Sequence, residues 1–141
     1  MSLTPDIFKI AALILSEGKL LVVRKKDTDV WISLGGKPEP EESHQETLQR
    51  EILEEIGVLI IGTPSLFHES PVEYAEGKPG KTVKIYSYLV TIVGTPRINV
   101  DDQIEEFQYI SKQDFESQTY KLGSVLEKFV VPKLIREGLM C

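Results

Sequence analysis

Three glutamates, Glu51, Glu54 and Glu55, stand at the spacing i, i+3 and i+4. On an α-helix this spacing places the three carboxylates on one face, within about 100° of one another. Like charges so close destabilise an isolated helix, but carboxylate oxygens are the ligands that Mg2+ and related hard cations prefer. The pattern therefore predicts a divalent-metal site. The alternatives are a solvated acidic face and an acidic partner-binding helix on an unrelated fold.

The acidic residues of the 141-residue chain are concentrated around these glutamates. The chain has 16 Lys and Arg against 22 Asp and Glu, a net charge of -6, and residues 39–55 hold seven glutamates against one arginine. By subtraction, the rest of the chain is neutral, with 15 acidic and 15 basic residues. Such local acidity favours a site over a general effect on solubility. It also argues against a nucleic-acid polymer as partner, because no basic stripe balances it.

A well-delimited helix is expected to carry the glutamates. Ser43 followed by Glu46 is a capping box, and Gly57 stands where a left-handed C-terminal cap belongs, so the helix is predicted from about residue 43 to residue 56. The apolar residues predicted to pack this helix on the core are Leu48, Ile52, Leu53 and Ile56.

Strand-like runs surround this helix and continue to a second helix. The runs rich in β-branched and aromatic residues are 6–15, 19–26, 30–34, 58–62, 65–73, 82–94 and 107–111. Residues 124–138 have helical spacing, with a kink expected at Pro132. The order of strands, helix, strands and helix predicts a mixed α/β (α+β) fold, with residues 1–141 as a single domain.

The remaining composition indicates a cytoplasmic protein. Cys141 is the single cysteine, so no internal disulfide can form, as is usual in a reducing compartment. The longest apolar run, residues 10–15, is too short to span a bilayer, and no secretory signal precedes it. We therefore expect no membrane partner.

The glutamates belong to a longer pattern of fixed residues. Its members are Gly36, Glu42, Arg50, Glu51, Ile52, Glu54, Glu55, Gly57 and Val58. This pattern resembles the Nudix box at every defining position, and the preceding "VWISLGGKPEP" is similar to the way the family enters this motif. Leu34 departs from the family, which most often has proline there, and Ser33 stands where leucine is usual. These departures concern the shape of the loop and suggest an atypical subgroup.

The resemblance implies a Nudix-type α/β/α sandwich and a metal-dependent pyrophosphohydrolase. Nudix hydrolases cleave a nucleoside diphosphate linked to another moiety by water attack on phosphorus, with Mg2+, or Mn2+, clamping the diphosphate. Substrates that fit the motif are nucleoside triphosphates, oxidised nucleoside triphosphates, ADP-ribose, nucleotide sugars and dinucleoside polyphosphates. The short chain favours a small, MutT-like nucleotide. Homodimers are common in the family, and the sequence leaves the oligomeric state open.

The resemblance also assigns roles by position. The implied metal ligands are Glu51, Glu54, Glu55 and the carbonyl oxygen of Gly36. The implied catalytic residues are Glu51, Glu54 and Arg50, with Glu51 as the general base in some members. The implied structural residues are Glu42, paired with Arg50, Gly35, which lets the backbone approach the ligand, and Gly57.

One departure affects the chemistry. Many members carry a further glutamate on a later loop, where this chain has Gln103, and a neutral amide cannot act as a general base. The candidates to replace that glutamate are Asp102, Glu105, Glu106 and Glu51. For this reason a catalytically inactive Nudix-fold module that binds nucleotides or regulates a partner stands as the alternative to an enzyme.

Other residues carry weaker signals. Arg24 and Lys37 are predicted to bind substrate phosphate, because Arg24 ends a strand and Lys37 follows Gly36. His44 is expected on the surface and His68 in a structural role. The aromatic residues of the strands are expected in the core rather than stacked on a base: Trp31, Phe67, Tyr86 and Tyr88.

Overall fold

The computed structural model describes residues 4–75, 78–99, 101 and 103–141. The strands are β1 (Ile7–Leu13), β2 (Leu15–Ser16), β3 (Lys19–Lys25), β4 (Trp31–Ile32), β5 (Leu34–Gly36), β6 (Leu59–Glu69), β7 (Glu73–Tyr74), β8 (Thr82–Val93) and β9 (Ile104–Ile110). The helices are α1 (His44–Ile56), α2 (Lys112–Glu116), the π-helical turn η2 (Leu126–Val130) and α3 (Val131–Arg136). Among these helices, none is long and apolar enough to cross a membrane.

The strands form two sheets. A five-stranded sheet has the order β5-β1-β8-β6, with β7 paired to β8, and a four-stranded sheet has the order β2-β3-β4, with β9 paired to β3. Within the first sheet β1 and β8 run parallel, whereas β5 and β6 pair antiparallel with their neighbours. The fold is therefore a mixed α/β fold, as the order of elements predicts.

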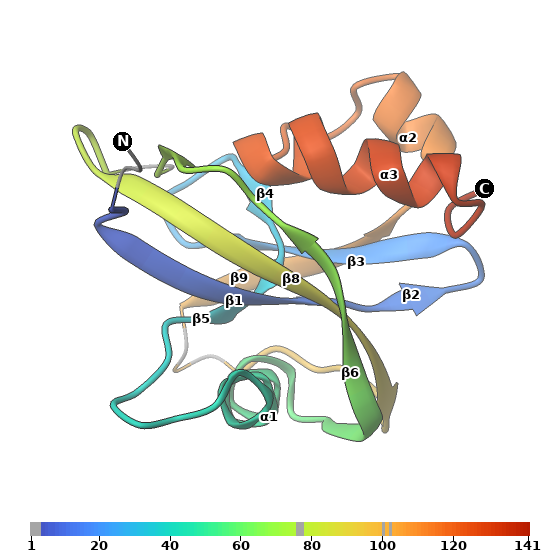
Figure 1. Ribbon diagram of the computed structural model, residues 1–141. Helices are drawn as coiled ribbons and strands as arrows, with labels where there is room; N and C mark the ends of the chain where they lie inside the picture. Colours follow the sequence, from blue (N-terminus) through green and yellow to red (C-terminus); the bar gives the residue numbers. More distant parts are fainter. Residues whose placement is uncertain (1–3, 76–77, 100, 102) are drawn as a thin grey trace.

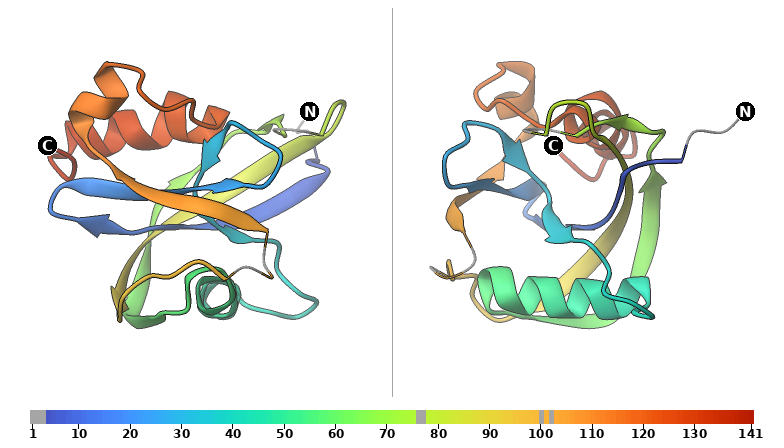
Figure 2. Two further views of the ribbon diagram at one scale, coloured as in Figure 1. Left: turned by 180° about the vertical axis from the view of Figure 1, so that it is seen from behind. Right: turned by 90° about the vertical axis from the view of Figure 1, so that its left-hand side faces the viewer.

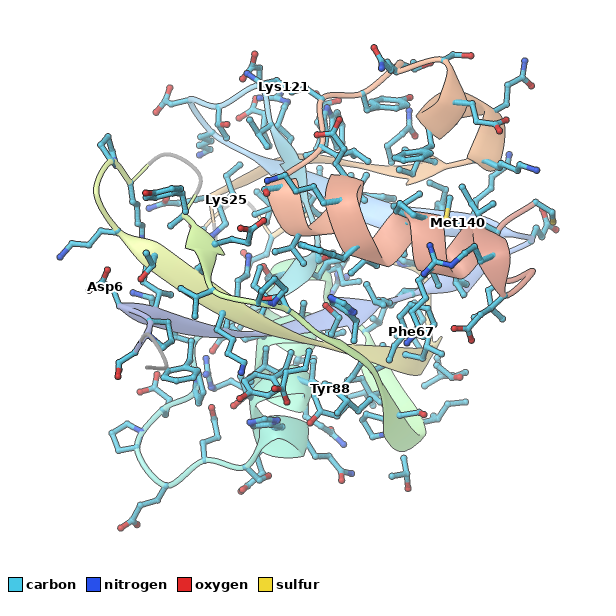
Figure 3. The ribbon with its side chains drawn as sticks, turned by 45° about the horizontal axis from the view of Figure 1, so that its top comes forward. Asp6, Lys25, Phe67, Tyr88, Lys121 and Met140 are labelled. Atoms are coloured by element: carbon cyan, nitrogen blue, oxygen red, sulfur yellow. The ribbon has the colours of Figure 1, made fainter. Side chains whose placement is uncertain are left out.

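Helices cover the sheets from two sides (Figure 1, Figure 2). One core lies under α1, where Leu48, Ile52 and Ile56 pack on Ile10. A second core lies under η2 and α3. Phe67 and Met140 belong to the second core, whereas Tyr88 packs at the edge of the first (Figure 3). These layers confirm the predicted α/β/α sandwich.

Residues 30–34, predicted as one strand, form two short strands in different sheets. β4 pairs with β3 of the four-stranded sheet, whereas β5 pairs with β1 of the five-stranded sheet. The chain passes between the sheets at Ser33. The two glycines that follow this run, Gly35 and Gly36, belong to β5.

The other boundaries differ in smaller ways. The strands predicted at 58–62 and 65–73 merge into β6, whose pairing with β8 shifts register twice. Helix α2 was not predicted, although Ser111 and Asp114 form its capping box. Pro132 follows the π-helical turn η2, in which the N–H of Val131 donates to the carbonyl of Leu126. A π-helical turn thus precedes the proline, which has no N–H to donate.

The buried face of α1 is rotated from the one predicted. Leu53, predicted in the core, is 51% exposed, whereas Glu55 is only 2% exposed. At about 100° per residue, Glu55 lies within about 20° of Leu48, and Leu53 lies about 140° away. The helix therefore presents a carboxylate, not a leucine, to the sheet beside its apolar stripe.

Candidate active site

Helix α1 is fixed at both ends. At its start the Ser43 hydroxyl accepts from the N–H of Glu46, and the Glu46 carboxylate accepts from the N–H of Ser43. At its end Gly57 has a φ of 69°, in the left-handed region, and its N–H donates to the carbonyl of Leu53. The capping box and the glycine cap predicted from the sequence are therefore confirmed.

A later loop also ties down the end of α1. The side-chain amide of Asn99 donates to the carbonyl oxygen of Glu54 at 2.8 Å. The backbone N–H of Asn99 donates to Glu55, and that of Arg97 donates to Ile56. Because these carbonyls have no partner inside the helix, the loop satisfies them and holds the turn that carries two of the three glutamates.

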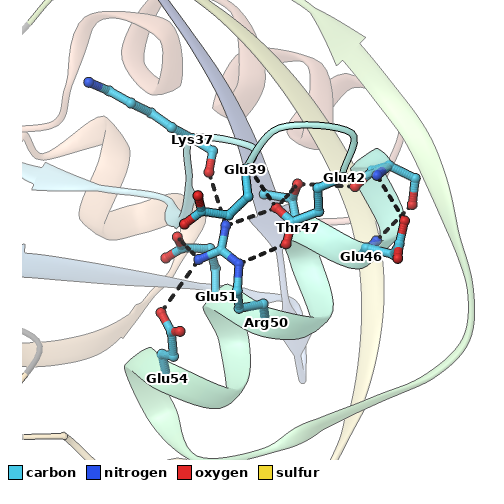
Figure 4. A network of polar contacts seen from close by, with 9 residues as sticks. Lys37, Glu39, Glu42, Glu46, Thr47, Arg50, Glu51 and Glu54 are labelled. Atoms are coloured by element: carbon cyan, nitrogen blue, oxygen red, sulfur yellow. Dashed lines mark hydrogen bonds and ion pairs between the residues drawn. The ribbon is translucent and has the colours of Figure 1, made fainter.

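Arg50 is the centre of a polar network that joins α1 to the preceding loop (Figure 4). Its Nε and Nη2 donate to the two carboxylate oxygens of Glu42, both within 2.9 Å. Its Nη2 also donates to the carbonyl of Lys37, and its Nη1 donates to Oε1 of Glu51 at 2.8 Å. Two of these bonds form the bidentate arrangement that gives arginine–carboxylate pairs their specificity.

The charge of Glu42 is held by this network. Hydrogen bonds from Arg50 lower the pKa of the Glu42 carboxyl to about 2, and the N–H of Glu39 contributes next. The hydroxyl of Thr47 also donates to Glu42. The carboxylate raises the pKa of Arg50 in turn. The predicted ion pair is therefore present, and it joins the loop to the helix.

Two of the three glutamates face the glycine pair of β5. The N–H of Gly35 donates to Oε1 of the buried Glu55 at 2.8 Å. Gly36 lies against Glu51, because a Cβ added to Gly36 would stand 2.5 Å from Cδ and Oε1 of that carboxylate. A side chain at position 36 would thus displace the carboxylate.

Glu54 lies apart from these two residues. Its side chain is 49% exposed, and its carboxylate is 3.6 Å from Nη1 of Arg50. Within the described parts of the chain, no three His, Cys, Asp or Glu side chains are grouped closely enough to hold a metal ion. The structure therefore brings Glu51 and Glu55 to the glycine pair and leaves Glu54 in solvent at its edge.

The residues nevertheless fit a hard divalent cation by their chemistry. The Glu51 carboxylate can lie against Gly36 only because that residue lacks a Cβ, and carboxylate oxygens and backbone carbonyls are the donor types of Mg2+ sites. Glu54 is half-exposed, so its side chain has room to change rotamer. Glu51, Glu54, Glu55 and the carbonyl of Gly36 would then hold the ion.

The two residues predicted to bind phosphate, Arg24 and Lys37, make different contacts. Lys37 contributes its backbone carbonyl to Arg50, while its side chain extends away from the carboxylates (Figure 4). Arg24 donates to Glu106 at 2.8 Å and to the carbonyl of Thr28. The structure therefore joins Arg24 to β9 and the β3–β4 loop rather than to α1.

The acidic residues around Gln103 are spread out. Gln103 is exposed at the turn before β9, with a φ of 63°, and its carbonyl accepts from the N–H of Lys26. Glu105 is exposed, and Glu106 pairs with Arg24. Asp102 lies outside the described residues.

The histidines and the aromatic residues of the strands pack against other side chains. His44 is half-buried, with its Nδ1 2.6 Å from the hydroxyl of Tyr88 and its ring packed on Tyr86. His68 stacks on Phe129. Two of the strand aromatics are in the core, namely Trp31 and Phe67.

Lys9 is a charged residue of β1 outside the motif. It is half-buried in β1, and its pKa is lowered to about 8. Burial is the main cause, followed by the charge of Lys25, while the carboxylates of Glu55 and Glu51 oppose the shift. A charged residue inside the otherwise apolar run "IFKIAAL" was the signal in the sequence that could have identified it.

These elements, a capped glutamate helix against a glycine pair in an α/β/α sandwich, define the Nudix class. The chain matches the family described as "NUDIX domain" over residues 8–130 and belongs to it. The curated protein "Nucleoside triphosphatase NudI" of Salmonella arizonae is 27% identical over 116 residues, which cover 75% of this chain and 82% of that protein.

Solved structures agree in fold. The MutT protein from Methanosarcina mazei Go1 superposes with a TM-score of 0.75 at 23% identity and covers 96% of each chain. The E. coli ORF135 protein has a TM-score of 0.65 at 26% identity and covers 92% of each chain. The chain is therefore a Nudix hydrolase, of the family that acts on compounds containing a nucleoside diphosphate.

Proposed function

We propose that this hydrolase is a Mg2+-dependent pyrophosphohydrolase of a small nucleotide, with Mn2+ as an alternative metal. We further propose that residues 1–141 form a single Nudix domain and that the protein works in the cytoplasm. The main support is the convergence of Glu51 and Glu55 on the Gly35–Gly36 pair, with Arg50 fixing Glu51. An arrangement of oxygen donors around a glycine cradle suits a cation and the diphosphate that it binds.

Each residue of the site has its own role in this proposal. Glu55 and Glu51 are the fixed ligands, and Glu54 turns in from solvent to complete the set. A bound Mg2+ would neutralise charge on the diphosphate and stabilise the leaving group. Arg50 keeps Glu51 in place and ties the loop to the helix through Glu42. Because the structure fixes Glu51 beside Gly36, we assign it first to metal binding and second to activation of water.

The proposed substrate is a nucleoside triphosphate, oxidised or not. The relative NudI is named a nucleoside triphosphatase, and the chain covers most of its length. ADP-ribose and nucleotide sugars are the next candidates, since all of them contain the same diphosphate unit.

A phosphate-release screen of purified protein tests the proposal. The panel contains nucleoside triphosphates, oxidised triphosphates, ADP-ribose and nucleotide sugars, each with Mg2+, Mn2+ or EDTA. We expect turnover that EDTA abolishes and that Glu54→Gln reduces by at least about 100-fold, the loss typical when one preorganised electrostatic contact is removed from an active site. The control is Glu116→Gln, which removes an exposed carboxylate at the end of α2 and is expected to leave the rate unchanged.

A nucleotide-binding module without catalysis is the second candidate. The neutral and exposed Gln103 favours it, because many family members have a glutamate there. Under this alternative, nucleotides would raise the melting temperature while no metal produced turnover. Equal turnover by the Glu54→Gln variant and the parent would instead contradict the assigned metal ligands.

A further inference from the structure

We propose that Asn99 is a positioning residue for metal binding. Its side-chain amide holds the last turn of α1 in the conformation from which Glu54 binds the cation beside Glu55. Asn99 lies outside the glutamate motif, 45 residues after Glu54. This inference rests on the proposed function, because it concerns the same metal site.

The carbonyl groups that end α1 have two kinds of hydrogen-bond donor. Backbone N–H groups donate to three of these carbonyls, namely those of Leu53, Glu55 and Ile56. The carbonyl of Glu54 instead accepts from the side-chain amide of Asn99, at 2.8 Å. An alanine at position 99 would leave the backbone donors in place and remove the side-chain donor. The backbone of Glu54 is therefore the part of this turn that depends on a side chain from another segment.

The amide of Asn99 is itself ordered by a second hydrogen bond. Its Oδ1 accepts from the N–H of Asp101 at 3.1 Å, while its Nδ2 donates to Glu54. The segment that follows β8 passes beside α1 (Figure 1), so this contact joins two parts of the chain that are distant in sequence. The donor thus reaches α1 from a side chain whose orientation is already set.

The last turn of α1 needs this support because of its charges. Glu54 and Glu55 repel each other and oppose the helix dipole, and the turn has no basic residue of its own. Helix ends also fray when their carbonyls lack donors. The Glu55 carboxylate is held in addition by the N–H of Gly35, whereas the side chain of Glu54 is 49% exposed. Fraying would therefore displace Glu54 more than Glu55.

An ordered backbone at Glu54 favours metal binding. With that backbone held, only the side chain of Glu54 has to rotate for its carboxylate to reach a cation at the glycine pair. If the turn frays, the conformation that can bind is populated for only part of the time, and the apparent affinity falls in proportion. The amide of Asn99 would thus control the affinity for the metal without touching it.

A purely structural cap is the competing explanation. In that case Asn99 stabilises the folded protein, and the folded protein binds metal equally well without it. The two explanations predict a similar loss of stability for Asn99→Ala but differ in the metal affinity of the folded state.

Binding of Mn2+ alone separates these explanations without requiring turnover. We would follow the EPR signal of free Mn2+ for the parent, Asn99→Ala and Asn99→Ser, at a temperature where all are folded. A serine hydroxyl can still accept from the N–H of Asp101 but is too short to replace the amide at Glu54. The control is Ser111→Ala, which removes the N-cap hydroxyl of α2 and costs a similar amount of stability. We expect both Asn99 variants to bind Mn2+ about 10-fold more weakly, as loss of a residue that orients metal ligands does, and Ser111→Ala to bind it like the parent.

A double-mutant cycle tests whether Asn99 acts through Glu54. Asn99→Ala should weaken Mn2+ binding less in the Glu54→Gln background than in the parent, because the carboxylate that it positions is already gone. Equal weakening in the two backgrounds would overturn the proposal. So would parent-like Mn2+ affinity in Asn99→Ala or Asn99→Ser, or an equal loss of affinity in Ser111→Ala. If Asn99→Ala does not fold, Asn99→Ser decides by the same criteria.

The outcome for the proposed function can be read separately. Weaker Mn2+ binding in the Asn99 variants, without turnover of any nucleotide by the parent, would sustain this inference and refute the proposed function. Turnover by the parent with unchanged Mn2+ affinity in the variants would do the reverse. Absence of Mn2+ and Mg2+ binding by the parent would refute both.

Discussion

Gly35 and Gly36 are neighbours in β5, but we expect a methyl group to have opposite consequences at the two positions. At Gly35 the φ of 124° lies where L-residues are strained, and the added Cβ would overlap the backbone carbonyl of Ile10. Backbone strain of this kind costs about 1–3 kcal/mol, and overpacking against rigid backbone costs about 1–3 kcal/mol more. Gly35→Ala should therefore destabilise the fold by about 2–6 kcal/mol. At roughly 3 °C per kcal/mol for a domain of this size, the melting temperature should fall by about 6–18 °C.

Gly36 differs because its neighbour is a side chain. Its φ lies outside the left-handed region, and the three atoms nearest to the added Cβ all belong to the Glu51 carboxylate, the closest at 2.5 Å. That side chain can rotate, so Gly36→Ala should lose less than about 1 kcal/mol of stability. The carboxylate would move by about 1 Å or more, however, and a displacement of that size can reduce a rate by about 100-fold.

The assay measures both variants in parallel. Thermal unfolding followed by circular dichroism gives the stability of each, and phosphate release with Mg2+ gives the activity at a temperature where both are folded. Gly36→Ala should be stable and nearly inactive, whereas Gly35→Ala should be unstable. Equal loss of stability in the two variants would refute the assignment of the Gly36 neighbour. Full activity of Gly36→Ala would show that the position of Glu51 does not control the chemistry.

Three further predictions concern the helix and its network. Asn99→Ala should lower the free energy of unfolding by about 1 kcal/mol, because the carbonyl of Glu54 loses its donor; an unchanged denaturant midpoint would contradict this. The pKa of Glu42 falls from its ordinary 4.5 to about 2 on folding, so its pair with Arg50 stabilises the fold fully above about pH 4.5 and loses that effect as pH falls towards 2. As the pH falls through this range, the melting temperature of Glu42→Gln should therefore drop less steeply than that of the parent protein. Parallel curves for the two proteins would exclude the Glu42–Arg50 pair as the cause. Leu53→Gln, at a half-exposed position, should change the unfolding free energy by less than about 0.5 kcal/mol, and a loss of 2 kcal/mol or more in urea unfolding would mean that Leu53 is part of the core.

The features of the fold that the sequence predicts well are those set by local signals. The limits of α1 follow from Ser43, Glu46 and Gly57, because a cap depends on residues within one turn of the helix end. The ion pair of Glu42 with Arg50 follows from the motif and is found at 2.8 Å.

The features missed by the sequence depend on pairing between distant segments. Whether residues 30–34 form one strand or two depends on β1 and β3 lying in different sheets, which no local pattern records. The placement of Arg24 depends on the pairing of β3 with β9, which brings Glu106 opposite it.

The three glutamates differ in the solvent exposure of their side chains. This difference suggests the order in which they would contact a bound cation. Glu55 is 2% exposed and its carboxylate accepts from the N–H of Gly35, so its position is fixed before any ligand arrives. The side chain of Glu51 is 16% exposed and bonds Arg50, whereas that of Glu54 is 49% exposed. A buried carboxylate is costly to desolvate unless hydrogen bonds and positive charge compensate it. In the proposed site a cation would add to that compensation at the buried end, and the exposed Glu54 would close over it last.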